Sequence, residues 1–350
     1  EPQIFQSETN GDIDTVSDFY EAPGTDVAYN INSDNNPLNR SFGSVDSAES
    51  ADDNLSWFDY RGDTVVIQRA GGNVQLVRPL NGGNPFKRAP WSVVVGLSGQ
   101  QVTPTDFGGA SRVYGVANNA FKDSGGRVPS DAVICISYNC ARQNQLIGVR
   151  FAATMNTLDD PRNPTQGNFL SLGTEQFISV GSDSPTFNRL RGSFTHFIPV
   201  DWLKIYPGCR PKPGETRDCK QALAFQFSAG TNIGQLPPYE AFCLGGGNSV
   251  RGYFDCDLGV GRSFGEATIE YRFPIFKIIS GELFIDGATA FGSQENVPGK
   301  PGELLEKPGS GFSVGTGLIV TTPVGPLRLE VASQDFSGEW RFNLGVGWKF

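Results

Sequence analysis

An arginine in a glycine-rich stretch and two carboxylates downstream of it are the residues with the clearest chemical potential. Residues 245–253 read Gly-Gly-Gly-Asn-Ser-Val-Arg-Gly-Tyr, so a flexible glycine segment leads to Arg251 between small and aromatic residues. Downstream, alternating apolar and polar residues predict strands that place Glu270, Phe284 and Asp286 on one face. A guanidinium folded against that face would form charge-assisted hydrogen bonds with the carboxylates. We therefore predict that Arg251 pairs with Asp286, with Glu270 as a second partner.

Two Gly-x-Ser-x-Gly strings, at 261–265 and 311–315, match the pattern of a hydrolase nucleophile elbow. That elbow requires a strand, a sharp turn and a helix, whereas strand-like sequence follows both strings. The only histidine, His196, precedes both serines, which is the wrong order for that fold. One histidine and no Cys-x-x-Cys pair also disfavour a metal site. We predict that the protein is not an enzyme and has no catalytic residue, metal or cofactor.

The six cysteines fall into three local pairs, each bracketing a loop-like stretch: Cys135 with Cys140, Cys209 with Cys219, and Cys243 with Cys256. An even number at such spacings indicates disulfides and an oxidising compartment. We predict three disulfides between neighbours, which places all three loops outside the cytoplasm. The strand count predicts the second pair on the periplasmic side and the other two on the outer side.

The composition favours many strands joined by turns. The chain has 44 glycines and 23 prolines in 350 residues, which disfavours long helices. Its net charge of −9 excludes nucleic acid as a natural partner, because no basic stripe could neutralise phosphates. No apolar run reaches the roughly 20 residues of a membrane-spanning helix. A transmembrane barrel needs no such run, since only every second residue of its strands faces lipid.

Regular alternation of apolar and polar residues predicts the strands themselves. It is clearest in six stretches: 91–98, 147–155, 223–230, 267–275, 327–331 and 342–350. The polar face of these stretches carries charged side chains in mid-strand together with glycines, as a water-filled lumen tolerates. We predict an all-β, transmembrane, antiparallel up-and-down barrel with about 11 strands. A soluble β-sandwich has the same period and is the structural alternative.

The barrel domain is predicted over residues 61–350. Residues 1–60 are acidic, rich in Asp, Asn and Ser, and indicate a loop-like, partly disordered segment. Short connections at 81–85 and 322–326 would lie on the periplasmic side, and longer ones (about 103–143, 232–262 and 292–310) on the outer side. The odd number of strands and the absence of a signal peptide lead us to expect that further strands precede Glu1.

Several of these motifs, in this order, resemble the BamA-like superfamily of outer-membrane assembly and translocation barrels. The Val250-Arg251-Gly252-Tyr253 string is similar to the signature of that family's sixth extracellular loop, which tucks back into the barrel. Phe284 and Asp286 match its strand-thirteen motif, and Glu270 lies in the strand before. The chain's last stretch resembles the C-terminal insertion signal of outer-membrane proteins, carried here by Phe342, Leu344, Val346, Trp348 and Phe350. We predict the ring of Phe350 at the membrane boundary.

The resemblance implies a 16-stranded barrel that follows periplasmic POTRA domains in the same protein. It implies membrane lipid and unfolded outer-membrane proteins as partners, and insertion or translocation of other proteins as the function. The string Gln-Leu-Pro-Pro-Tyr-Glu-Ala-Phe at 235–242 is similar to the cyanobacterial and plastid-related branch, so a bacterial, cyanobacterial-like outer membrane is the expected location. A two-partner secretion channel that exports one dedicated protein is the alternative within this superfamily. A passive porin is the alternative from another class.

Overall fold

The computed structural model describes residues 13–15, 27–28, 66–82, 89–105, 113–117, 133–160, 163–212, 214, 219–304, 307–322, 325–334 and 340–350. Most of the predicted acidic segment 1–60 therefore lies outside the described residues, as do parts of the predicted turns at 81–85 and 322–326. Within the segment, two short strands are described, β1 (Ile13–Thr15) and β2 (Val27–Ala28).

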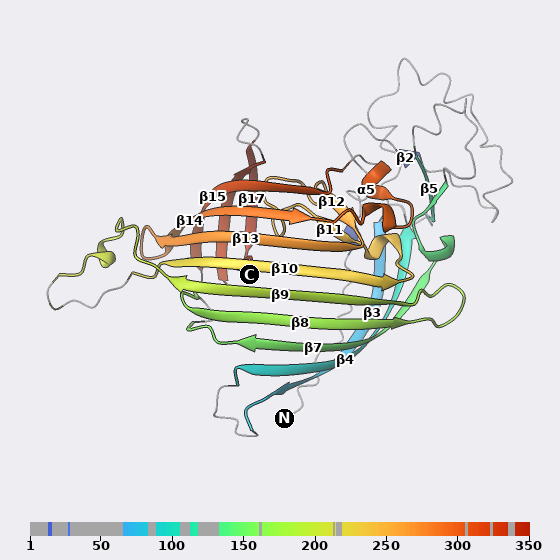
Figure 1. Ribbon diagram of the computed structural model, residues 1–350, viewed down its shortest axis with the longest axis horizontal. Coiled ribbons are helices and arrows are strands. Elements are labelled where there is room, and N and C mark those ends of the chain that lie inside the picture. Colours follow the sequence, from blue (N-terminus) through green and yellow to red (C-terminus); the bar gives the residue numbers. More distant parts are fainter. Residues whose placement is uncertain are drawn as a thin grey trace, which may run out of the picture.

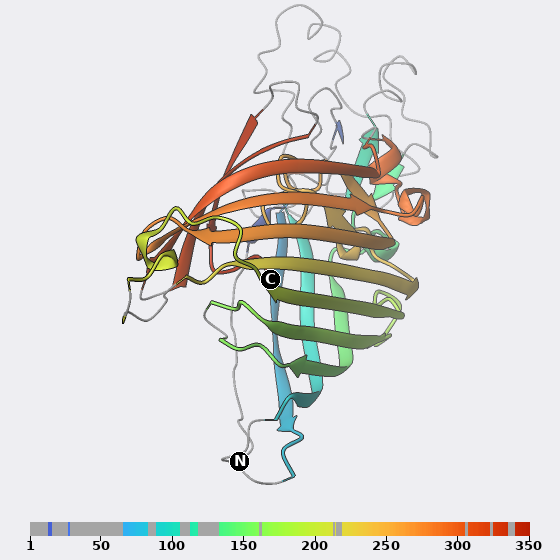
Figure 2. The same ribbon diagram turned by 60° about the vertical axis from the view of Figure 1, so that its left-hand side comes forward.

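One large antiparallel sheet dominates the molecule, and it curves round so that its two ends face different directions (Figures 1 and 2). After β1, its strands are β3 (Val66–Pro79), β4 (Trp91–Thr105), β7 (Asn144–Asn156), β8 (Gly167–Ile178), β9 (Phe187–Pro199), β10 (Ala222–Gly234), β13 (Ser263–Pro274), β14 (Ile279–Thr289), β15 (Ser310–Thr322), β16 (Gly325–Ser333) and β17 (Trp340–Val346).

Strands that follow one another in the large sheet are also neighbours in space. The order runs from β1 and β3 to β16 and β17 without a crossover, and every pairing is antiparallel. The predicted all-β, up-and-down fold with about 11 long strands is confirmed. Among the described residues, β1 and β17 form the two edges of the sheet.

Helical structure is minor in the described residues. It comprises α5 (Pro301–Leu304) and four single turns, η4 (Tyr138–Cys140), η5 (Pro207–Cys209), η6 (Pro238–Glu240) and η7 (Gln294–Asn296). None of the helices in this part of the chain is long and apolar enough to cross a membrane.

The two faces of the sheet have opposite character. One face exposes large apolar side chains in mid-strand; Leu97, Phe151 and Ile285 are 61%, 52% and 52% exposed. The other face buries charged groups, among them Glu270 and Asp286, at 1% and 0% exposure. A soluble β-protein has the reverse distribution, because its apolar face packs into a core. The apolar face is therefore the outer, lipid-facing wall of a transmembrane barrel, and the polar face lines its interior.

Successive connections alternate between the two ends of the strands, but their lengths do not divide as predicted: the long connection 200–221, from β9 to β10, lies at the end of the short turn between β13 and β14 (Figure 1). The connection from β4 to β7 contains β5 (Tyr114–Ala117) and β6 (Val133–Cys135), and that from β10 to β13 contains the paired strands β11 (Phe242–Leu244) and β12 (Gly259–Gly261). The three predicted disulfides are confirmed, with Cα–Cα distances of 4.8, 4.6 and 4.6 Å. Cys209–Cys219 lies in the β9–β10 connection, at the opposite end from the other two.

The last strand is shorter than its sequence predicts. Alternation continues to Phe350, but β17 ends at Val346 and Gly347 adopts a positive φ of 88°. At that residue the backbone turns, and the final three residues leave the strand. They turn toward the inner wall, so the prediction of a single strand to Phe350 is wrong.

Candidate functional site

The β10–β13 connection folds back onto the inner wall, and its glycines allow it to do so. Gly245 and Gly246 have φ values of 113° and 88°, which other residues rarely adopt. Gly252 has φ of 101°, and a Cβ there would lie 3.2 Å from the Cβ of Ser313 on β15. Val250 is completely buried in an apolar cluster with Leu244, Leu258 and Phe264, among others. Backbone freedom and one apolar anchor thus bring Arg251 against the wall.

Arg251 is fully buried and forms a bidentate pair with Asp286. Its Nε donates to Asp286 Oδ2 at 2.7 Å, its Nη2 donates to Oδ1 at 2.9 Å, and its backbone N–H donates to Oδ2 at 3.1 Å. Its Nη1 donates to Glu270 Oε2 at 3.2 Å and to Glu330 Oε1 at 2.8 Å. The structure thus brings together the arginine and both carboxylates that alternation assigns to one face, and it adds Glu330 from β16.

The aromatic ring of Phe284 packs against the guanidinium of Arg251. Its ring centroid lies 3.3 Å from Arg251 Cζ, close enough for a strong cation–π contact. A Cβ on Gly315 would collide with this ring, and one on Gly311 would lie 2.5 Å from the hydroxyl oxygen of Tyr253. The second Gly-x-Ser-x-Gly string therefore has a structural reason: its two glycines leave room for Phe284 and for the loop.

The C-terminal segment enters the same network through Lys349. Its Nζ donates to Asp286 Oδ1 at 2.8 Å, to Thr268 Oγ1 at 3.1 Å and to the carbonyl of Ser249 at 2.6 Å. One carboxylate, that of Asp286, thus holds both the loop arginine and the residue just beyond the last strand. The sequence did not predict that Glu330 would bind Arg251 or that Lys349 would bind Asp286.

Arg272 holds the two aromatic residues that flank Lys349. Its Cζ lies 4.2 Å from the ring centroid of Trp348 and 5.0 Å from that of Phe350, and Phe197 of β9 completes the contact at 5.5 Å. Arg272 Nε also donates to Glu270 at 2.5 Å. The ring of Phe350 therefore packs on the inner wall. The prediction that it lies at the membrane boundary is wrong. Phe342, Leu344 and Val346 lie on the outer face of β17, each at least 67% exposed.

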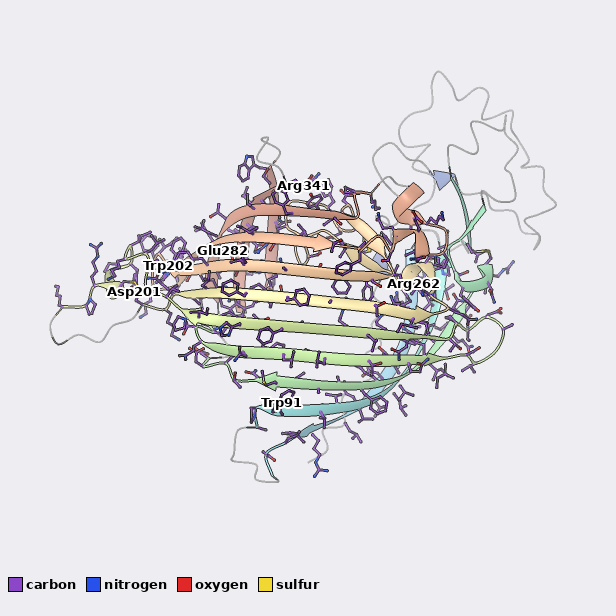
Figure 3. All side chains as sticks on the ribbon, viewed as in Figure 1. Trp91, Asp201, Trp202, Arg262, Glu282 and Arg341 are labelled. Atoms are coloured by element: carbon purple, nitrogen blue, oxygen red, sulfur yellow. A yellow bond between two sulfur atoms is a disulfide. The ribbon has the colours of Figure 1, made fainter. Side chains whose placement is uncertain are left out.

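The inner wall buries four basic and four acidic side chains in this region, which we call the wall network: Arg251, Arg272, Arg328, Lys349, Glu270, Glu282, Asp286 and Glu330. Arg328 joins Glu330 at 2.9 Å and also donates to the carbonyl of Gly347 at 2.9 Å. Glu282 (Figure 3) differs from the other three acids, because neither of its carboxylate oxygens has a hydrogen-bond partner among the described residues. Low polarity strengthens each of these pairs and penalises any group left without a partner.

A second buried charge anchors the loop to the far side of the curved sheet. Glu240, in η6, accepts from Arg69 of β3 and from Arg189 of β9, both at 2.5 Å. The neighbouring Tyr239 hydroxyl donates to Asn144 of β7 at 2.9 Å. Burial alone would raise the pKa of Glu240, but Arg189 and Arg69 outweigh burial and hold it below its ordinary value. Three strands separate β3 from β9 in the sheet, so this clamp spans the inner surface.

Sequence reasoning found part of this arrangement. Alternation placed Glu270, Phe284 and Asp286 correctly on the inner face. The glycines before Arg251 indicated a flexible segment that lets this arginine fold against that face. The same alternation carried a signal for Arg272, Arg328, Glu330 and Lys349, which share that face, but it could not say which of them the loop reaches. The string around Glu240 indicated only a resemblance to one branch of a family, since no local pattern shows that its partners come from β3 and β9.

These features define a class: a transmembrane β-barrel whose inner wall binds an arginine from a long loop. The chain belongs to the Omp85 superfamily, whose domain matches residues 6–350. It is therefore an outer-membrane type of barrel and not an enzyme.

Similar proteins include three from Arabidopsis thaliana. Outer envelope protein 80, chloroplastic, is 45% identical over 123 residues, which is 35% of this chain and 17% of that protein. Outer envelope protein 39, chloroplastic, is 38% identical over 167 residues, 48% of this chain and 41% of that protein. Protein TOC75-3, chloroplastic, is 32% identical over 164 residues, 47% and 18% respectively. The matched stretches thus span less than half of each relative.

The crystal structure of BamA from Haemophilus ducreyi lacking POTRA domains 1–3 has the same fold. It superposes with a TM-score of 0.52 at 15% sequence identity, over 80% of this chain and 53% of that one. At that identity the likeness concerns the arrangement of strands alone.

Proposed function

We propose that this barrel inserts or translocates other proteins at an outer membrane. The observation that carries the proposal is that the Arg251 loop and the residues after the last strand bind the same carboxylate, Asp286. Because both segments bind Asp286, a displacement of the residues that follow edge strand β17 would also disturb the binding of the Arg251 loop inside the barrel. This coupling is what a barrel that admits substrate strands at its edge requires.

The edge strand β17 is suited to accept another strand. It pairs with β16 over seven residues, from Trp340 to Val346, and its outward side chains Phe342, Leu344 and Val346 are the most exposed large apolar groups of the sheet among the described residues. The loop reaches this strand directly, because Arg341 Cζ lies 3.4 Å from the ring centroid of Phe254. A substrate hairpin would add to β17 by main-chain hydrogen bonds, which need no particular sequence.

The wall network favours this function over a passive porin. A porin requires a water-filled passage, whereas here the loop and the C-terminal residues occupy the inner face around Asp286 and bury its charges. A two-partner secretion channel also fits such a wall and stays the second candidate. The named relatives are chloroplast proteins, two of them outer envelope proteins by name, which supports an outer membrane as the location. We further propose a cyanobacterial-like membrane, with POTRA domains in the same protein and unfolded outer-membrane proteins as partners.

The test measures folding of an unfolded outer-membrane protein into lipid vesicles that contain this protein. Folding is followed by the heat-dependent gel mobility of the substrate barrel. We expect faster folding with the wild-type chain and a loss of that acceleration with Arg251→Ala. Arg150→Ala is the matched control, since Arg150 is an exposed arginine of β7 on the same inner face. Ion conductance without any acceleration of folding would support the porin instead.

A further inference from the structure

Tyr271 occupies a lipid-facing position that the chain itself covers. It has the same phase on β13 as Ile269, which is 43% exposed, yet Tyr271 is only 8% exposed. The covering residues begin the β9–β10 connection: the Trp202 ring centroid lies 5.0 Å from that of Tyr271, and the N–H of Leu203 donates to the Tyr271 hydroxyl at 3.2 Å. This connection therefore folds back over the outer wall.

Gln221 fixes the connection in this position. Its Oε1 accepts from the N–H groups of Trp202 and Leu203, both at 3.2 Å, and from the Tyr271 hydroxyl at 2.6 Å. Its Nε2 donates to the carbonyl of Leu203. The disulfide Cys209–Cys219 closes the distal part of the connection. The segment is thus tied at its base by buried hydrogen bonds and at its far side by a covalent link.

The segment nevertheless exposes two large apolar side chains. Trp202 is 61% exposed and Ile205 is 59% exposed. Figure 3 shows Trp202 at the same end of the strands as Trp91 of β4. The charged residues of 201–210 are Asp201, Lys204 and Arg210, and Lys204 pairs with Asp201 at 3.5 Å.

We propose that residues 201–210 are an interfacial anchor, with Trp202 and Ile205 inserted at the boundary between lipid headgroups and acyl chains. The outer wall continues directly into the segment at Tyr271, so the bilayer that surrounds the wall also meets Trp202. Tryptophan favours this boundary because its ring is apolar and its N–H stays near water. The inference requires only that the barrel spans a membrane and is independent of what the barrel transports.

The experiment locates Trp202 by fluorescence quenching in vesicles. The full chain is reconstituted with lipids brominated near the headgroup, and quenching is compared between wild type and Trp202→Phe, which keeps a ring against Tyr271. Trp91→Phe is the reference, because Trp91 is an outward-facing belt residue at the same end. We expect Trp202→Phe to remove a share of bromolipid-quenchable fluorescence similar to that removed by Trp91→Phe. The Trp202 contribution should also resist soluble acrylamide.

The opposite pattern overturns the proposal. If the Trp202 contribution is quenched by acrylamide and unaffected by bromolipid, the segment faces water and its apolar residues serve a protein partner. Heat-dependent gel mobility establishes that each variant is folded before it is measured. Failure of the folding assay with the wild-type chain would refute the proposed function and leave this measurement intact.

Discussion

Asp286 is the residue on which the loop and the C-terminal segment converge. Its carboxylate accepts three hydrogen bonds from Arg251, one from Thr268 and one from Lys349. The partners come from different parts of the chain, so the loss of this single carboxylate would weaken the attachment of the loop and of the C-terminal segment together. Glu282 lies on the same strand and is equally buried, but no hydrogen bond among the described residues holds its carboxylate.

This contrast gives a matched pair of variants on β14. Asp286→Asn removes one partner of buried charge pairs, which typically costs about 3–5 kcal/mol, because Lys349 loses its counter-charge and Arg251 keeps only Glu270 and Glu330. Glu282→Gln removes a carboxylate that has no hydrogen-bond donor, and we expect an unchanged or higher stability. The midpoint of unfolding in detergent measures both. Equal losses of stability in the two variants would contradict the difference that their surroundings predict.

At the scale of elements, alternation predicted the strands well and the ends of the strands poorly. Four of the six alternating stretches lie within β4, β7, β10 and β16, and a fifth extends one residue beyond β13. The sixth overshoots β17, because Trp348 and Phe350 keep the apolar phase of a strand while Gly347 breaks it. Alternation records which side chains avoid water, and Phe350 avoids water against Arg272 and Phe197 of the inner wall. Contacts between distant elements, such as the Glu240 clamp, leave no periodic trace in the sequence.

The packing of Phe350 changes what its deletion should do. The ring contributes a cation–π contact to Arg272, typically about 1–2 kcal/mol when shielded from water. We expect deletion of Phe350 to lower stability in detergent by an amount of that order. If Phe350 is also part of the insertion signal, insertion in cells should slow by more than this loss of stability explains. Phe350→Tyr keeps the ring and is the control. Cell fractionation against detergent unfolding separates the two effects; a proportional decline would leave packing as the sufficient cause.

The clamp at η6 predicts a dependence on pH. The pKa of Glu240 is lowered in the folded protein, so its stabilisation is present above the ordinary value of about 4.3. It declines as the pH falls through the lowered value, because the carboxylate then becomes neutral. Glu240→Gln removes this contribution at every pH. We expect the gap between the unfolding midpoints of the wild type and Glu240→Gln to be largest at neutral pH and to shrink on acidification.

If the difference in unfolding midpoint between the wild type and Glu240→Gln stays constant across that pH range, the charge of Glu240 does not contribute to the clamp, and packing and neutral hydrogen bonds account for its effect. Glu175→Gln serves as the control. Glu175 is a carboxylate of the inner face that accepts a hydrogen bond from Ser98 at 2.8 Å, so its variant shows the effect of losing an inner-face carboxylate that lies outside the clamp.

For the whole molecule, the described inner surface is bridged rather than open. The Glu240 clamp joins the β3 wall to the β9 wall, while Arg251 and Lys349 fix the loop and the C-terminal segment to β14. We expect the reconstituted chain to conduct ions poorly in planar bilayers. The double variant Arg251→Ala, Lys349→Ala should conduct more, because it releases both segments from Asp286 at once, whereas Arg150→Ala should not change the conductance. A large conductance of the wild-type chain, unaltered by the double variant, would mean that these segments do not obstruct the passage.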